Sequence, residues 1–201
     1  MKQFGHSDAL VRCRNASHAN HSANSDGRPT GRPSRLIFID VSGAARVNFP
    51  HYRPTFDFMS FGAGVVVFDY NGDGKEDIYI TADADAFIPE RDGFNALYRN
   101  NGCGTFTDVA HRAGVDDPLS KGNGGCAADY DDDGDQDLLV ANWGSSKLFN
   151  NSGGGTFNDV TVDAGLGDPD ATYRSMGCAW GDYDRDGFLD FVVVRHIDES
   201  N

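Results

Sequence analysis

From Leu36 onward the chain alternates short apolar runs with segments rich in Gly, Asn and Asp, and the same order of segments recurs. The first run opens with glycine and ends in aspartate, as in GVVVFD (64–69), GGCAAD (124–129) and GCAWGD (177–182). The second run starts nine residues after that aspartate, as in IYIT (78–81), LLVA (138–141) and FVVV (191–194). Such runs on either side of turn residues predict two strands joined as a hairpin.

A second hairpin is predicted further along two of the repeats. LYRNNGCGTFTDV (97–109) and LFNNSGGGTFNDV (148–160) each place an Asn/Gly turn between two short strands. Four strands per repeat, with offsets of 60 and 53 residues between the loops of the first hairpins, are typical of β-propeller blades. We therefore predict an all-β fold, a partial β-propeller spanning 35–201, with blades at 62–110 and 123–161 and an incomplete blade at 176–195.

The segment LIFIDV (36–41) resembles the last strand of the repeat but has no partner before it. Since a strand from one terminus of a propeller often completes the blade formed by the other, we assign it to a closing blade. Propellers need roughly four to eight blades, so two and a half blades cannot close a ring. We therefore expect the missing blades of a longer parent chain as partners. The first repeat also carries ten extra residues near 83–93, which we expect on a surface loop.

Residues 1–34 are rich in Asn, Ser, His, Arg and Gly, which predicts a disordered leader. A mispredicted start of the gene would also explain them. No apolar segment typical of a signal peptide is visible, and no run of 18 apolar residues predicts insertion into a membrane.

The composition favours a packed domain with concentrated negative charge. Hydrophobic residues make up 39% of the chain, which is enough for a core. The formal net charge is −14, from 31 acidic and 17 basic residues. Nucleic-acid binding needs clustered Lys and Arg, so this balance argues against a nucleic-acid partner. The acidic residues gather at 69–77, 129–137 and 182–190, as expected for cation sites.

Each of these three nine-residue loops carries oxygen donors at positions 1, 3, 5 and 9. They are Asp69, Asn71, Asp73 and Asp77; Asp129, Asp131, Asp133 and Asp137; and Asp182, Asp184, Asp186 and Asp190. Calcium takes six to eight oxygens, and alternate residues of a tightly curled loop point inward to supply them. The spacing therefore predicts about three structural Ca2+ ions, one in each loop.

Two further positions of the loop support this interpretation. Position 6 is glycine in every copy, as expected where the backbone turns sharply with a positive φ. Position 7 is expected to offer only its backbone carbonyl oxygen, which explains why unlike residues are accepted there. These residues are Lys75, Asp135 and Phe188.

Other interpretations of the loops remain open. An EF-hand would place a Glu at position 12 and helices on either side, whereas position 12 here is apolar and lies in a predicted strand. Acidic turns without a cation would show the same residue types, but like charges repel and solvated turns have no reason to keep one spacing three times. Magnesium prefers a rigid octahedron and retains its waters, so calcium is favoured.

Four cysteines are too few for a disulfide framework, and none lies in a C-x-x-C pair that would suggest zinc or redox chemistry. Cys126 and Cys178 lie three and four residues before a loop aspartate, on strands that we expect to be buried. We expect them to fill space in the core, with a disulfide between them as the alternative.

GVVVFDYNGDGKEDIYI and LYRNNGCGTFTDVAHRAGV resemble the FG-GAP/VCBS-type repeats of integrin α-chain propellers, and in particular the ASPIC/UnbV and cartilage-acidic-protein group. The resemblance covers about residues 36–195. It implies a seven-bladed, calcium-stabilised propeller that is extracellular, periplasmic or on the cell surface.

Neither a P-loop nor a Ser-His-acid signature is visible, and we expect the chain not to be an enzyme. The first functional hypothesis is a calcium-dependent binding or adhesion module with a protein or glycan partner. The alternative is a non-catalytic propeller scaffold of a larger secreted enzyme. Fold alone does not decide between the two.

Overall fold

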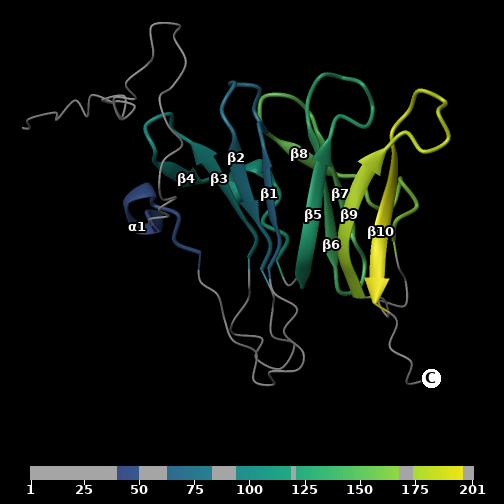
Figure 1. Cartoon of the computed structure of the whole chain (residues 1–201), viewed down its shortest axis with the longest axis horizontal. Coiled ribbons are helices and arrows are strands. Elements are labelled where there is room, and N and C mark those ends of the chain that lie inside the picture. The colour runs from purple at the N-terminus through teal and green to yellow at the C-terminus, as the bar shows by residue number, and fades with distance from the viewer. Residues whose placement is uncertain (1–39, 50–62, 83–93, 119–120, 168–173, 197–201) are drawn as a thin grey trace, which may run out of the picture.

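The computed structural model describes residues 40–49, 63–82, 94–118, 121–167 and 174–196. Within these residues the chain forms two four-stranded antiparallel sheets and one two-stranded sheet, which stand side by side in Figure 1. The predicted all-β fold of propeller blades is confirmed. The leader 1–34, the inserted residues 83–93 and most of the predicted strand 36–41 lie outside the described residues.

Each sheet follows the chain order of its strands, and we call the three sheets blade 1, blade 2 and blade 3. Blade 1 contains β1 (Val65–Phe68), β2 (Asp77–Ile80), β3 (Ala96–Asn100) and β4 (Phe106–Asp108). Blade 2 contains β5 (Gly122–Ala128), β6 (Asp137–Asn142), β7 (Lys147–Asn151) and β8 (Phe157–Asp159). Blade 3 contains β9 (Arg174–Gly181) and β10 (Asp190–His196). The predicted hairpins are thus formed.

The main core lies between blades 1 and 2. We call the face of a blade that is turned toward the next blade in the chain its front, and the opposite face its back. The front of blade 1 packs on the back of blade 2 through buried side chains, which include Val66, Phe68, Tyr79, Leu97, Leu138, Val140 and Phe149. Because side chains alternate between the two faces of a strand, β1 alternates between exposed and buried residues.

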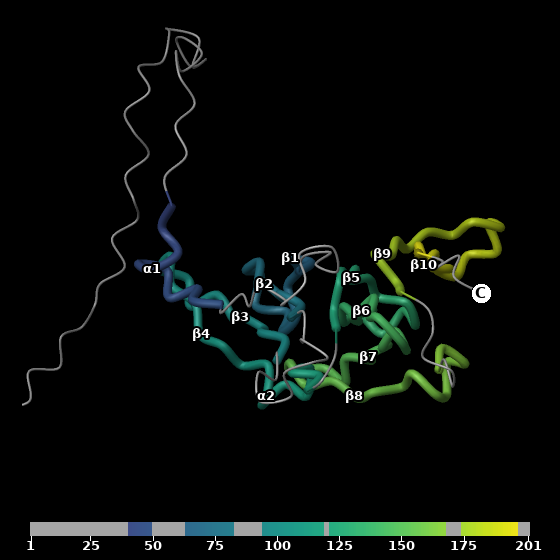
Figure 2. The backbone as a smooth tube through the Cα atoms, turned by 90° about the horizontal axis from the view of Figure 1, so that it is seen from below, coloured from purple at the N-terminus to yellow at the C-terminus, as the bar shows by residue number. Residues whose placement is uncertain are grey.

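The first strands of the three blades are neighbours. β1 contacts β5, and β5 contacts β9. Figure 2, which is seen from below, shows these strands side by side, with β4 and β8 on the outer side of their sheets. Where the first strands of two blades face each other across an interface, there is little room for side chains on both strands. This constraint explains the glycines of the first apolar run.

At the glycine that opens each first run, the backbones of neighbouring blades touch. A Cβ atom on Gly64 would lie 2.4 Å from the Cα of Gly124, and one on Gly124 would lie 3.2 Å from the Cα of Gly177. Around Gly177 itself, no atom of the described chain lies within 4 Å of such a Cβ. The glycine therefore sets the spacing between the blades that the structure describes.

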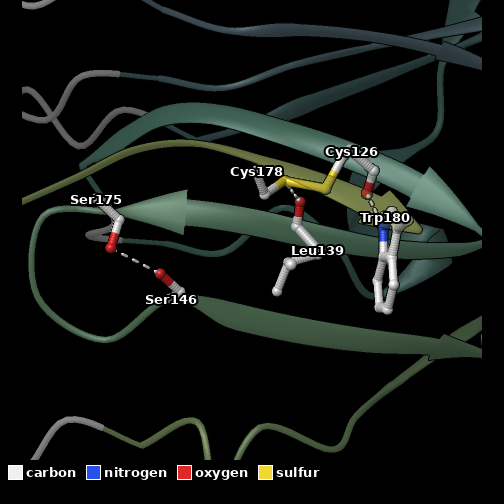
Figure 3. The surroundings of a disulfide bond; sticks show 6 residues. All are labelled: Cys126, Leu139, Ser146, Ser175, Cys178 and Trp180. Carbon is white, nitrogen blue, oxygen red and sulfur yellow. Dashed lines mark hydrogen bonds between the residues drawn. A yellow bond between two sulfur atoms is a disulfide. The ribbon is translucent and has the colours of Figure 1, made fainter. Parts of the chain in front are cut away.

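A disulfide also joins blades 2 and 3, and it corrects the expectation that Cys126 and Cys178 only fill space. The two residues are bonded to each other, with their Cα atoms 5.8 Å apart (Figure 3). Because side chains alternate between the two faces of a strand, residues three and four positions before the loop aspartate point to opposite faces. Cys126 is three positions before its aspartate and points to the front of β5. Cys178 is four positions before its own aspartate and points to the back of β9. These are the two faces that meet. Cys103 is disulfide-bonded as well.

Other contacts close the same interface. The indole Nε1 of Trp180 donates a hydrogen bond to the Cys126 carbonyl oxygen over 3.4 Å, and the hydroxyl of Ser146 donates to that of Ser175 over 3.1 Å. Ser175 is buried. Blade 3 is therefore fixed to blade 2 by a covalent bond, by polar contacts and by the stacked rings of Tyr130 and Trp180, whose centroids lie 5.9 Å apart.

Two short helical turns in the structure were not predicted from the sequence. Helix α1 (Ser42–Ala45) and helix α2 (Ala110–Ala113) each begin two residues after an aspartate that accepts a hydrogen bond from the first helical amide. The pattern D-V-x-x-x-A occurs at 40–45, 108–113 and 159–164. Asp40 and Val41, the described end of the predicted strand 36–41, thus lead into α1, as expected for the end of a fourth strand.

In the described part of the chain, no helix has the length and apolar character that crossing a membrane would require.

Gly64→Ala is expected to destabilise the fold by about 1–3 kcal/mol, because the added methyl would meet the backbone of Gly124 and overpacking has costs of this size. Gly177→Ala is the matched control and should change the free energy of unfolding by less than about 0.5 kcal/mol. Urea unfolding of both variants gives the comparison. Equal effects would show that the glycines do not set the spacing between blades.

Loss of the Cys126–Cys178 bond is expected to lower the free energy of unfolding by about 2–4 kcal/mol. Since either substitution breaks the same bond, Cys126→Ala, Cys178→Ala and the double variant should lose similar amounts under oxidising conditions. Additive losses in urea unfolding would instead indicate two independently packed cysteines.

Candidate metal sites in the first hairpin of each blade

The three Asp-rich loops connect the first and second strands of their blades, as predicted. All three lie along one edge of the molecule, at the top of Figure 1. In each loop the aspartate at position 1 accepts hydrogen bonds from the backbone amides of positions 5 and 6. For Asp129 these bonds measure 3.0 Å to the Asp133 amide and 3.0 Å to the Gly134 amide. Asp69 and Asp182 make the same pair of bonds.

The loop backbone turns through two left-handed residues. The predicted positive φ at position 6 is confirmed at Gly74, Gly134 and Gly187. Position 4 is also left-handed in every copy, at Gly72, Asp132 and Arg185, with φ of 68°, 59° and 65°. The two non-glycine residues adopt an unfavourable conformation there, because their Cβ atoms crowd the backbone. The loop geometry is therefore the same in all three blades despite different residues.

Positions 1, 3 and 9 bring their oxygens together. In the second loop, Asp129, Asp131 and Asp137 place one carboxylate oxygen each within 4.8 Å of the others. Asp182, Asp184 and Asp190 do the same in the third loop. These triads have the chemistry and the spacing to hold a metal ion. Asn71 replaces the position-3 carboxylate in the first loop, so that loop offers an amide oxygen beside Asp69 and Asp77.

Position 5 is not part of these triads. Its carboxylate instead accepts a hydrogen bond from the amide of position 7, over 3.1 Å at Asp73, 2.9 Å at Asp133 and 2.9 Å at Asp186. In the first loop the second oxygen of Asp73 also lies 2.9 Å from Nζ of Lys75. That lysine holds the pKa of Asp73 below its ordinary value. The position-5 side chains and the position-7 carbonyls of Lys75, Asp135 and Phe188 stay predicted ligands.

In blades 1 and 2 the aspartate at position 9 is buried and links three parts of its blade. One oxygen of Asp137 accepts a hydrogen bond from the Tyr130 amide over 3.0 Å, and the other accepts from the Asn151 amide over 2.8 Å. Asp77 is bound in the same way by the amides of Tyr70 and Asn100. Both aspartates have no exposed surface. Position 9 therefore joins the loop, the second strand and the third strand.

The asparagine that supports position 9 was not predicted from the sequence. Asn100 and Asn151 occupy the same place in the second hairpin, and the side-chain amide of each donates to the carbonyl oxygen of the residue before the position-9 aspartate. Asn151 also donates to the Tyr70 carbonyl oxygen of blade 1 over 2.8 Å. The repeated Asn-Asn/Ser-Gly turn was a visible signal for this role. Asparagine is common in turns for conformational reasons alone, so the sequence did not reveal the contact to position 9.

Burial and like charge oppose ionisation at position 9. Burial raises the pKa of Asp137 to about 6, although the amides of Asn151 and Tyr130 act against it, and the charges of Asp131 and Asp133 raise it further. Burial raises the pKa of Asp77 in the same way. A divalent cation would remove this conflict, because it neutralises several carboxylates at once. The residues therefore fit a hard cation such as calcium.

The third loop has the same geometry in a more open setting. Asp190 accepts a hydrogen bond from the Tyr183 amide over 3.0 Å, as at the other two position-9 aspartates. It is exposed, however, because blade 3 has only two described strands and no asparagine from a third strand covers it. The triad of this loop is thus formed without the support that blades 1 and 2 provide.

The comparison with protein families agrees with this geometry. The model of the FG-GAP-like repeat matches residues 69–140 and 129–193, which together are more than half of the chain. The chain belongs to the FG-GAP-like repeat family. Each match of this FG-GAP-like repeat protein starts at position 1 of an Asp-rich loop and runs to the second strand of the next blade, so it contains two loops.

Several relatives of this FG-GAP-like repeat protein share part of its sequence. Cartilage acidic protein 1 of Xenopus tropicalis is 39% identical over 86 residues, which are 41% of this chain and 13% of that protein. The proteins of the same name from Mus musculus and Homo sapiens are each 43% identical over 67 residues, which are 33% of this chain and 10% of the relative. The chain thus matches only 10–13% of the length of these relatives.

The stability of the metal-free FG-GAP-like chain is expected to depend on pH through Asp137. Because its pKa rises from 3.8 to about 6 on folding, the folded state holds this proton more tightly than the unfolded chain does. The contribution is fully present below about pH 4 and is lost as the pH rises through about 6. The thermal midpoint of the wild type in chelator should therefore fall over this range by more than that of Asp137→Asn. Parallel pH profiles of the two proteins would contradict this assignment.

Proposed function

We propose that this chain is a calcium-stabilised β-propeller module whose ions are structural, and that it serves binding or adhesion outside the cytoplasm rather than catalysis. The observation that carries the proposal is the repeated junction at position 9. There, a buried aspartate holds the third strand of its blade and faces other carboxylates of its loop. Calcium at this point would stabilise the loop, the hairpin and the contact to the next strand together.

The donor set favours calcium over magnesium. Each loop gathers carboxylate or amide oxygens on a flexible turn, and calcium accepts six to eight such ligands in irregular geometry. Magnesium requires a near-ideal octahedron and keeps several waters. About three ions are expected in this chain, one for each loop. The first loop should bind most weakly, since Asn71 supplies no charge and Lys75 pairs with Asp73.

A location outside the cytoplasm is supported by two observations. The first is the Cys126–Cys178 disulfide, because disulfides persist in oxidising compartments and are rare in the cytosol. The resemblance to the cartilage-acidic-protein group points the same way. An extracellular, periplasmic or cell-surface position also supplies calcium at concentrations that structural sites of moderate affinity require.

The partner in this proposal is a protein or glycan, held by surfaces of the blades. The carboxylates with the most perturbed environment are already bound by backbone amides, as at Asp77 and Asp137, so they act on the fold of their own blade. This commitment favours a binding module over an enzyme. The proposal concerns this chain, which corresponds to a small part of its relatives.

The sharpest test of calcium binding compares Asp131→Asn with Asp132→Asn. Asp131 belongs to the triad of the second loop, whereas Asp132 is the exposed left-handed residue beside it, a conformation that asparagine tolerates. Both variants lose one negative charge. Asp131→Asn should weaken calcium binding at that loop at least about tenfold, which corresponds to about 1.4 kcal/mol, and Asp132→Asn should leave it nearly unchanged.

Titration calorimetry counts the ions and gives their affinities, and thermal unfolding in calcium, magnesium and chelator measures the stabilisation. Each saturated site should contribute about 2.7 kcal/mol when free calcium is about 100 times its dissociation constant. Combining Asp129→Asn with Asp131→Asn should remove one binding equivalent. No binding by a folded sample, or an unchanged count in this double variant, would refute the proposed sites.

A further inference from the structure

A pocket of about 570 Å³ opens in blade 1, at the edge opposite the Asp-rich loops. It lies where β3 begins and where β4 runs into α2, and the antiparallel pairing of the strands places both points at this edge. The volume is within the range of small-molecule sites, about 300–1,000 Å³. Its lining includes Phe94, Asp108, Val109, His111, Arg112 and Asp116.

The repeat shows which of these residues the fold of a blade requires. Asp108 and Asp159 occupy the same place in blades 1 and 2, and each accepts a hydrogen bond from the backbone amide two residues later. That aspartate is therefore part of the blade itself. The other polar and aromatic groups of the pocket differ between the two copies. Phe94, His111, Arg112 and Asp116 of blade 1 correspond to Ser145, Val162, Asp163 and Gly167 of blade 2.

The pocket is open with a blade on either side of it. Blade 2 covers the front of blade 1, yet the side chain of His111 remains 97% exposed. Blade 2 in turn has blade 1 behind it, and there Val162, at the position of His111, is 84% exposed. The opening is therefore a property of this position in the blade, which neither neighbouring blade covers.

Asp108 offers a carboxylate oxygen to a ligand in this pocket. In blade 2, one oxygen of Asp159 accepts from the backbone amide of Thr161, and the other accepts from Nζ of Lys147 over 2.7 Å. Ala96 takes the place of this lysine in blade 1. Asp108 keeps the bond from the Ala110 amide over 3.1 Å, and no donor of the described chain binds its second oxygen.

Arg112 and His111 add hydrogen-bond donors beside this carboxylate. Arg112 is exposed, and no carboxylate of the described chain forms an ion pair with it. The ring of His111 is held by Asp116, whose Oδ2 lies 2.8 Å from Nδ1, so the second ring nitrogen is left for a ligand. A guanidinium group presents several N–H donors in one plane, which suits neighbouring oxygens of the same ligand.

The rest of the lining is apolar, which narrows the class of ligand. The ring of Phe94 is 50% exposed, and the buried Val109 also lines the pocket. A pyranose sugar is amphipathic in the same way, with C–H groups on one face and hydroxyl groups around its rim. The face of an aromatic ring carries partial negative charge and attracts such C–H groups. Two carboxylates oppose an acidic ligand and Arg112 opposes a basic one, so charge favours an uncharged sugar.

From this set of groups we propose that the pocket of blade 1 binds an uncharged hexose unit of a glycan. Phe94 stacks on the C–H face of the sugar, while Asp108 accepts from one hydroxyl group and Arg112 donates to a neighbouring one. His111, fixed by Asp116, borders the same site. This inference rests on the proposed function, of which it names the glycan as the partner and blade 1 as the place of binding.

The test titrates the methyl glycosides of glucose, galactose and mannose into the full chain in millimolar calcium, with saturation-transfer NMR as the measurement. At least one glycoside should bind saturably. Phe94→Ala and Arg112→Ala should each raise its dissociation constant at least about fivefold. Ser145→Ala and Asp163→Ala, at the corresponding positions of blade 2, are the matched controls and should stay within about twofold of the wild type. Since Arg112 is exposed, its variant tests the pocket even if Phe94→Ala loses stability.

Three outcomes would overturn the proposal. They are no saturable binding of any of the three glycosides, binding that both pocket variants leave unchanged, and stronger binding of methyl glucuronide than of methyl glucoside. The first outcome would leave a protein as the partner. The calcium-dependent thermal shift is measured on the same samples. An intact shift without sugar binding refutes only the pocket, and sugar binding without a shift refutes only the calcium sites.

Discussion

A carboxylate group that has no exposed surface, and that faces other carboxylates, lies at the centre of each complete blade. Asp77 and Asp137 both accept backbone amides from the loop and from the third strand. The same group therefore closes the first hairpin and attaches it to the second. Burying such a charge is unfavourable unless it is neutralised, by a proton or by a cation. Under the proposed function, the stability of the blade and the binding of metal would therefore depend on the same carboxylate group.

The contacts between blades depend on this junction as well. The loop that the position-9 aspartate holds also presents the tyrosine of position 2, and Tyr70 reaches blade 2 through Phe157 and Asn151. Asn151 contributes its amide to Asp137 and its side chain to Tyr70. One residue therefore connects the Asp-rich loops of two successive blades. The loop of blade 1 is thus in direct contact with blade 2.

Much of this structure could be predicted from the sequence, because the informative signals are local and occur three times. The apolar runs on either side of the Asp-rich loops predicted the first two strands of all three blades. The sharp turn expected at position 6 predicted the positive φ found at Gly74, Gly134 and Gly187. Features that depend on contacts across an interface could not be found in this way. The bond between Cys126 and Cys178 requires knowledge of which faces of β5 and β9 meet. The helical turns after the fourth strand were visible as a repeated D-V-x-x-x-A, but four-residue helices leave little periodicity.

The disulfide described between β5 and β9 lies along the inner strands, whereas the acidic loops lie at one edge of the blades. The disulfide requires an oxidising environment, and under the proposed function the acidic loops would require an ample supply of calcium. The cytosol provides neither. Under the proposed function, such a chain would complete its native structure only after leaving the cytosol, which would couple its maturation to its destination.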